Sequence, residues 1–275
     1  MKKFKDWAFQ WMQVITLIIL AIIPLIFDFA SIIRSIFEEK TVDFDTVKYY
    51  WLMKLGNGVI GIALMLVFLF TILRVYNNKK LLNKGQLYHD HFYIGYLFCA
   101  KVLGYKKCSL VRVPIPMQVK LIIRDTFDEY DYGEDIDYKN FENENITVEG
   151  PVGDYTSTIN LVLSDTYPIT RGMLPASTSN LSTVWVLRDN KENATRVYSS
   201  KFYEEVRNIV QKLPSNVYRI NLYSTLNPKH CWWITRNVFK QGGRSNIRAL
   251  TVFPQPYKNG NWNFSEVGAL VFDEK

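Results

Sequence analysis

The sequence is poor in the residues from which catalytic and metal sites are most often built. Its 275 residues include only three cysteines and three histidines. The cysteines, Cys99, Cys108 and Cys231, are odd in number and show no paired spacing, which excludes a disulfide framework and predicts reduced cytosolic thiols. Walker A, GxSxG and HExxH sequences are also absent, which excludes the enzyme classes that they mark.

The histidines are the remaining enzyme candidates. His89 and His91 flank Asp90, and in a strand both imidazoles could face one metal ion. No third ligand is nearby, and His230 lies far along the chain beside Cys231, where adjacent side chains of a helix point apart. We therefore predict no catalytic residues, no metal and no cofactor. A metal-dependent membrane-bound enzyme is kept as a less favoured alternative.

Two stretches, 8–27 and 55–73, contain no charged residue. Each is long enough to cross a hydrocarbon core of about 30 Å as a helix. The first stretch is longer than the roughly 7–15 residues of a signal-peptide core, and no small-x-small cleavage site follows it. The sequence therefore predicts a two-helix transmembrane region over residues 1–84, with an outward loop over about 28–54.

The orientation follows from the placement of Lys and Arg, which favour the cytoplasmic side of a membrane. Basic residues precede the first stretch and follow the second: Lys2, Lys3, Lys5, Arg74, Lys79, Lys80 and Lys84. The connecting loop is acidic, with Glu38, Glu39, Asp43 and Asp45. These patterns predict a two-pass membrane protein with both termini in the cytoplasm.

Several polar residues lie within or beside the apolar stretches: Gln10, Gln13, Thr16, Asn57 and Thr71. Polar side chains in lipid usually bond to a partner helix, so we favour interhelical hydrogen bonds over a pore lining. Two helices cannot enclose a water path, and a channel would need several copies of the chain. Gly58 and Gly61 predict a close helix contact.

Residues 85–150 form the second predicted region, a juxtamembrane subdomain of uneven charge. Residues 74–124 hold ten Lys or Arg against one acid, whereas residues 125–145 hold nine Asp or Glu against one lysine. The basic section predicts contact with anionic lipid headgroups, and the acidic section predicts a solvated loop. The apolar run 92–100 predicts an interfacial or buried helix, and residues 108–123 predict extended segments broken by two prolines.

Residues 151–275 alternate between strand and helix patterns. Strands are predicted at 159–164, 183–187, 217–223, 247–253 and 267–272, with helices at 202–213 and from Pro228 to about 239. Ser199 or Ser200 is the predicted N-cap of the first helix, and Asn227 that of the second. The fold class is therefore two N-terminal transmembrane α-helices followed by a cytosolic α/β Rossmann-like domain.

In such a sheet, ligands bind beyond the carboxyl ends of the strands. There the sequence places its candidate ligand-binding residues: Asp165, Thr166, Tyr167, Arg171, Ser224, Thr225, Asn227 and Lys229. Unoccupied N–H groups at the start of the Pro228 helix would suit a phosphate, Tyr167 a base and Lys229 a charge. Taken singly, these side chains are also typical of ordinary turns.

The segment from Asn160 to Phe272 resembles part of a SAVED domain, the Rossmann-like sensor related to CARF domains. The resemblance lies in the strand Leu161-Val162-Leu163-Ser164-Asp165-Thr166, in the helix at Phe202-Tyr203-Glu204-Glu205-Val206, in Ile220-Asn221-Leu222-Tyr223-Ser224-Thr225-Leu226-Asn227-Pro228 and in the 262–270 tail. It covers about two fifths of the chain. Trp232 and Trp233 depart from it, and one of the two halves of a full sensor is missing.

The resemblance implies an effector of bacterial antiphage signalling in the inner (plasma) membrane that binds a cyclic or linear oligonucleotide. A nucleotidyltransferase encoded nearby would make this messenger, and a second chain would supply the missing half-sensor, giving a homo-oligomer. Ligand binding would then rearrange the spans and disrupt the membrane or open a pore. The alternatives are a membrane-anchored scaffold that recruits a protein partner and, because the basic section is rich in aromatic residues, a nucleic-acid-binding protein.

Overall fold

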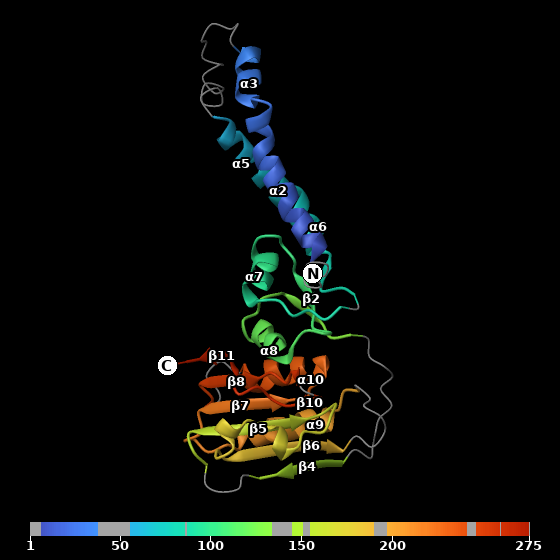
Figure 1. The fold of residues 1–275 in the computed structure, drawn as a ribbon, viewed down its shortest axis with the longest axis vertical. Helices are drawn as coiled ribbons and strands as arrows, with labels where there is room; N and C mark the ends of the chain where they lie inside the picture. Colours follow the sequence, from blue (N-terminus) through green and yellow to red (C-terminus); the bar gives the residue numbers. More distant parts are fainter. Residues whose placement is uncertain are drawn as a thin grey trace. The chain divides into compact units, whose positions relative to one another are not determined.

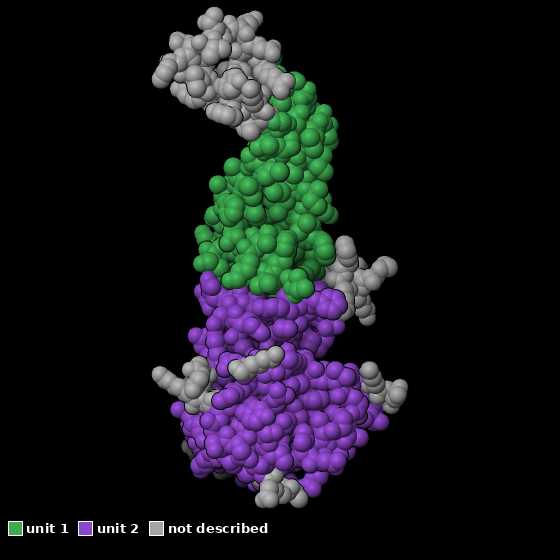
Figure 2. Space-filling model, turned by 90° about the vertical axis from the view of Figure 1, so that its left-hand side faces the viewer, with its two compact units in different colours: residues 1–83, 94–107 green, residues 84–93, 108–275 purple. Residues whose placement is uncertain are grey.

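The computed structural model describes residues 7–37, 56–85, 87–133, 145–150, 155–189, 197–240, 246–258 and 260–274. The chain forms two compact units, coloured separately in Figure 2. We call residues 1–83 with 94–107 the helical unit, and residues 84–93 with 108–275 the sheet unit. These boundaries follow packing and differ from the three regions predicted from the sequence, 1–84, 85–150 and 151–275. The basic residues before 7, the loop residues 38–55 and the acidic residues 134–144 lie outside the described ranges.

The helical unit contains both predicted membrane helices. The first is α2 (Ala8–Ile26), and the second runs over Asn57–Asn78 as α5 (Asn57–Phe68), the π-helical turn η1 (Leu69–Leu73) and α6 (Arg74–Asn78). Both are long and apolar enough to cross a membrane. Their apolar side chains are largely exposed, as at Ile18 and Ile62, which suits a lipid environment. A shorter helix, α3 (Phe29–Phe37), follows α2 after Asp28, whose φ of 44° ends the first helix.

The two long helices approach each other closely at one glycine. A Cβ atom added at Gly61 would lie 2.1 Å from the backbone oxygen of Ala21, so only glycine fits this crossing. Nothing lies within 4 Å of the corresponding position at Gly58. The predicted close contact is therefore confirmed at Gly61 and wrong at Gly58.

Polar side chains join the helices at two places. Gln13 Nε2 donates to Asn77 Oδ1 at 2.8 Å, and Asn77 Nδ2 donates back to Gln13 Oε1 at 3.2 Å. At the other end Asn57 Oδ1 accepts from the Ala30 N–H at 2.7 Å. The predicted interhelical bonds are confirmed for these residues. Thr16 and Thr71 each bond a carbonyl of their own helix four residues earlier, at 3.0 and 2.6 Å.

Strand β1 (Leu81–Leu82) and helix α7 (Tyr93–Lys101) complete the described regular structure of the helical unit. The run 92–100, predicted to be an interfacial or buried helix, is thus helical. Its side chains divide by face, with Tyr96 and Cys99 fully buried and Ile94 largely exposed. The helix therefore carries apolar side chains on its exposed face as well as on its buried face.

All three cysteines are buried free thiols, as the sequence predicts. Burial raises the pKa of Cys99 and of Cys231 to about 12, because the thiolate loses its hydration. We expect a maleimide at pH 7–8 to leave the folded protein unlabelled, since the thiolate is the reactive form. Mass spectrometry should find three labels after denaturation. Stoichiometric labelling of the folded protein would contradict this burial.

The sheet unit is built on a six-stranded sheet in the order β11-β8-β7-β5-β6-β4 (Figure 1). Its strands are β4 (Asn145–Glu149), β5 (Thr158–Ser164), β6 (Thr183–Asp189), β7 (Arg219–Ser224), β8 (Ala249–Phe253) and β11 (Ala269–Asp273). The four central strands are parallel, and both edge strands pair antiparallel. The predicted parallel α/β sheet is confirmed.

The two faces of the sheet are covered differently. Alternate residues of β5 point to opposite sides: Leu161 and Leu163 join a large core with helices α8 (Ile115–Ile123), α9 (Ser200–Gln211) and α10 (Pro228–Ile234). Val162 joins a smaller cluster under the loop that holds the 3₁₀ turns η2 (Arg171–Met173) and η3 (Ala176–Thr178). The helices therefore pack on one face, and loops cover the other.

The predicted helix caps are present. Ser199 Oγ accepts from the Phe202 N–H at 3.0 Å at the start of α9, and Asn227 Oδ1 accepts from the His230 N–H at 2.8 Å at the start of α10. A π-helical turn, η4 (Thr235–Phe239), continues α10 to the predicted end. A small antiparallel pair, β9 (Tyr257–Lys258) and β10 (Asn261–Trp262), precedes β11.

The prediction for residues 108–123 is wrong in its main part. After the short strand β2 (Lys107–Ser109) the chain forms helix α8, with Pro114 as its N-cap and Pro116 in its first turn. Proline fits the first turn of a helix because the N–H groups there have no intrahelical partner. The described start of the acidic section contains strand β3 (Glu129–Asp131).

Candidate functional site

The candidate site lies where strands β5 and β7 end side by side. Because Leu163 and Ser224 are register partners, the residues after each strand meet. The Thr225 N–H donates to the Leu163 carbonyl at 3.0 Å, and the Thr166 N–H donates to the Thr225 carbonyl at 3.1 Å. The hydroxyls are also used internally: Thr166 Oγ1 donates to the same carbonyl at 2.5 Å, and Thr225 Oγ1 donates to the Tyr167 carbonyl at 2.8 Å. This edge is therefore a closed hydrogen-bonded turn.

Asp165 is the centre of a buried polar network. Its side chain is fully buried, and Oδ1 accepts from Arg188 at 2.9 Å. Oδ2 accepts from the Asn227 N–H at 3.0 Å and lies 2.7 Å from His230 Nδ1. Burial raises the pKa of Asp165, but its interactions with His230, the Asn227 N–H and Arg188 lower that pKa by more, so the net direction is downward. The carboxylate is thus held ionised inside the domain.

His230 links this carboxylate to the start of helix α9. Its Nδ1 faces Asp165, and its Nε2 accepts from the Ser199 N–H at 2.8 Å. Nδ1 also lies 2.9 Å from Asn227 Nδ2, and Nε2 lies 3.1 Å from the Ser199 carbonyl oxygen, so both ring nitrogens have polar neighbours. The ring is fully buried against Phe202, with 5.2 Å between ring centroids. His230 therefore joins β5, α9 and α10 from the interior.

Backbone N–H groups at the N-terminus of α10 are already bonded within the protein. The sequence predicts unoccupied N–H groups there for a phosphate, but the Asn227 N–H bonds Asp165 and the His230 N–H bonds the Asn227 side chain. The prediction is wrong at these two groups. The chain places its own carboxylate where an anion would be stabilised by the helix end.

The eight predicted site residues divide into two groups. Asp165, Thr166, Ser224, Thr225 and Asn227 are brought together and are buried. Tyr167 is 53% exposed, Arg171 is exposed and pairs with Glu149 at 3.3 Å, and Lys229 is half-buried. Contact between these residues and a ligand stays a prediction. Tyr167, Arg171 and Lys229 have the accessible side chains.

An aromatic and cationic surface surrounds Lys229, and sequence reasoning missed most of it. Lys229 Nζ lies 5.0 Å from the Tyr198 ring centroid and 5.6 Å from that of Tyr132. Tyr132 in turn lies 5.9 Å from Trp232, which packs edge-on against Trp233 at 5.0 Å. The two tryptophans are visible in the sequence as a departure from the SAVED pattern. Their tyrosine partners come from distant segments that no local pattern connects to them.

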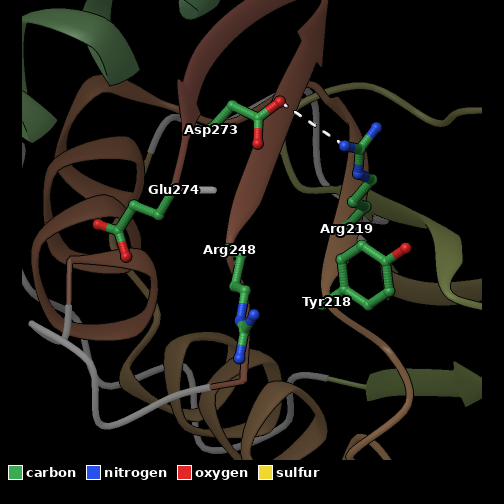
Figure 3. A pocket seen from close by; sticks show the side chains of 5 residues that line it. All are labelled: Tyr218, Arg219, Arg248, Asp273 and Glu274. Atoms are coloured by element: carbon green, nitrogen blue, oxygen red, sulfur yellow. Dashed lines mark ion pairs between the residues drawn. The ribbon is translucent and has the colours of Figure 1, made fainter.

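A hollow of about 280 Å³ lies at the opposite edge of the sheet, lined by Tyr218, Arg219, Arg248, Asp273 and Glu274 (Figure 3). Arg219 and Asp273 form an ion pair of 3.7 Å across part of it. Strand β7 begins here, so this is the amino end of the parallel strands. Two acids balance the two arginines, which makes the hollow a poor site for a polyanion.

The histidine pair of the basic section does not assemble a metal centre. His89 is buried and His91 is half-buried. Within the described ranges no group of three or more His, Cys, Asp or Glu side chains is placed to hold a metal ion. The structure therefore gives the metal-enzyme alternative no described site.

These features define a membrane protein with two apolar helices and an α/β unit. The family model described as "SMODS- and Ubiquitin system-associated 2TM effector domain" (SUa-2TM) matches residues 1–266, and the chain belongs to this family. No curated protein matches the sequence.

Two solved structures of an Acinetobacter baumannii Cap4 SAVED/CARF-domain containing receptor are similar to parts of this chain. The structure with the cyclic trinucleotide 3'3'3'-cAAA has a TM-score of 0.40 and 8% identity over 64% of this chain. The structure with 2'3'3'-cAAA has a TM-score of 0.43 and 8% identity over 65% of this chain. Each match covers 41% of the Cap4 chain, and the trinucleotides are ligands of that receptor.

Proposed function

We propose that the protein is a membrane-anchored effector of antiphage defence. Its α/β unit binds a cyclic oligonucleotide second messenger, and its chains then oligomerise to disrupt the membrane or form a pore. The observation that carries this proposal is the match of one effector-family model across both apolar helices and most of the sheet unit. One family model that spans both the anchor and the domain is typical of a protein in which one part controls the other.

The proposed orientation places both termini and the sheet unit in the cytoplasm of a bacterium, where such a messenger is made. The asymmetry of basic residues around the two apolar stretches supports it. Buried free thiols are also typical of a reducing compartment. A nucleotidyltransferase encoded beside this gene would supply the messenger.

The ligand-binding surface that we propose is the accessible part of the predicted site. Tyr167 and the rings around Lys229 offer faces for base stacking, while Lys229 and Arg171 offer charge to phosphates. In this proposal the buried residues, with Asp165 at their centre, hold the surface in place from beneath. The ligand is then recognised by the exposed aromatic and basic side chains.

Binding can be measured by calorimetry with the full chain in nanodiscs against a panel of cyclic di- and trinucleotides. We expect one member to bind, and Lys229→Ala to weaken its affinity by about ten- to a hundredfold, because a charge-assisted contact to phosphate contributes about 1.5–3 kcal/mol. Lys212→Ala is the matched control, since Lys212 is exposed at the far end of α9 and should leave binding unchanged. No binding across the panel, or equal loss in both variants, would refute the proposed site.

Membrane disruption is tested separately with the full chain in dye-filled liposomes. The ligand identified by calorimetry should release dye and should increase the oligomer size measured by mass photometry. Intact vesicles at full ligand occupancy would remove the membrane-disruption part of the proposal and leave the sensing part standing.

A further inference from the structure

Helix α7 exposes two apolar side chains on one face. Ile94 is 77% exposed and Phe98 is 40% exposed, and at a spacing of four residues they lie side by side. Lys101, one turn further, is also exposed, whereas Tyr96 and Cys99 on the opposite face are buried. Two neighbouring exposed apolar side chains on one helix face are a candidate contact with a membrane or with another protein.

The buried face of α7 is fixed to the start of the first membrane helix. Trp7 packs on Gly95 so closely that an added Cβ there would lie 2.7 Å from its ring. The Trp7 indole N–H donates to Asn83 Oδ1 at 3.1 Å, and Asn83 Nδ2 donates to the Tyr96 hydroxyl at 3.1 Å. The rings of Trp7 and Tyr96 meet edge to face at 5.2 Å.

The chain at the end of α7 is fixed to the second membrane helix in the same way. Arg74 donates to the Lys101 carbonyl at 2.6 Å, and Asn77 donates to the Leu103 carbonyl at 2.8 Å. All of these residues belong to the helical unit. Helix α7 is therefore held at the ends of both apolar helices by the buried Trp7 and Tyr96 side chains and by the hydrogen bonds of Arg74 and Asn77.

Those helix ends have the composition of a membrane–water boundary. Phe9, Trp11 and Tyr76 are 42–46% exposed there, and Lys80 Nζ lies 4.8 Å from the Tyr76 ring centroid. Exposed aromatic rings mixed with basic residues are typical of the interface of a bilayer. The open face of α7 is thus attached at the level where lipid headgroups meet acyl chains.

We infer that α7 is an interfacial helix, which inserts Ile94 and Phe98 into the acyl boundary of the bilayer that the two long helices cross. Lys101 then extends to the headgroup phosphates. The bilayer is the occupant because this face is fixed to helix ends that lipid already surrounds. Such a helix lies in the membrane plane, with its apolar side buried roughly 5–10 Å below the headgroups. Helix α7 would therefore contact the membrane in addition to the two spans.

The test uses environment-sensitive fluorophores on the full chain in liposomes that contain brominated lipids. Three single variants, Ile94→Cys, Ile62→Cys and Asn208→Cys, are labelled with a maleimide dye while the native buried thiols stay unlabelled. Ile62 is 53% exposed near the middle of the uncharged stretch 55–73 and reports insertion, and Asn208 is exposed on α9 in the sheet unit. Bromines are placed at a shallow or a deep acyl position.

We expect the label at residue 94 to lose roughly half of its emission to shallow bromines and less to deep ones, as for a helix at the acyl boundary. The label at residue 62 should respond more to deep bromines, and the label at residue 208 to neither. The inference is overturned if the label at residue 94 is not quenched by bromine and emits as it does in water, while the label at residue 62 is quenched. It is also overturned if the label at residue 94 emits as in an apolar environment but is not quenched. That result would mean that protein, such as a second copy of the chain, covers the face.

Discussion

Replacing Asp165 with alanine is expected to destabilise the sheet unit by about 3–5 kcal/mol. The change leaves the buried guanidinium of Arg188 without its carboxylate and removes the acceptor of the Asn227 N–H and of His230. Both partners of the ion pair have side chains no more than 3% exposed, and breaking such a pair costs far more than its net contribution to folding. For a unit of this size the melting temperature should fall by about 6–20 °C. Intrinsic tryptophan fluorescence during heating measures it.

The control for this variant is an ion pair on the surface. Glu149→Ala removes the partner of Arg171, and both side chains are well exposed, so the expected loss is under about 1 kcal/mol. Equal effects of the two substitutions would show that Asp165 is not the centre of a buried network. Because Asp165 and His230 lie on the inside of the α10 start, we also expect ligand binding to weaken in step with the loss of stability.

The pH dependence gives an independent check on the same carboxylate. The pKa of Asp165 in the folded protein lies below its usual value near 4, so folding favours the ionised form. Its contribution to stability is fully present above about pH 4 and is lost as the pH falls through the lowered folded-state pKa. Asp165→Ala should therefore lose stability at neutral pH and become less sensitive to acid than the unsubstituted chain.

The fold of the sheet unit was largely predictable because its signals are local. The apolar runs of β5, β6 and β7 are buried central strands, and the apolar residues of α9 recur at helical spacing between two recognisable caps. The prediction for residues 108–123 was wrong because proline can interrupt a strand or begin a helix, and the surrounding residues do not distinguish the two cases. Packing against the sheet decides it, since Val119 and Ile122 fill the main core.

The candidate site was only half predictable for a different reason. Parallel strands end at one edge, so the sequence could place Asp165 and Thr225 together. It could not show that Asp165 meets Arg188 and His230, because these residues come from three separate elements and one of them is 65 residues away. A polar residue beyond a strand looks the same in sequence whether it faces a ligand or the interior. Burial separates the two cases.

The second large effect is expected in the membrane helices, at Gly61. The Cβ of any other residue would lie 2.1 Å from the backbone oxygen of Ala21, and a backbone atom cannot move away by changing rotamer. Gly61→Val should therefore force the two helices apart and cost about 3 kcal/mol, the upper end of the usual range for overpacking. Spin labels at Ile18 and Leu64, both exposed to lipid, should report a larger interhelical distance by pulsed electron paramagnetic resonance.

Gly58 provides the matched control, because it lies one turn away on the same helix and nothing stands within 4 Å of its added Cβ. Gly58→Val should leave both the distance between the two spin labels and the stability of the helical unit unchanged. If both variants behaved alike, the helices would not cross at Gly61 as closely as the structure shows. If only Gly61→Val separates the helices, its effect on dye release from liposomes tests the proposed function directly. An effector that acts through packed spans should then release dye to the same extent with and without ligand.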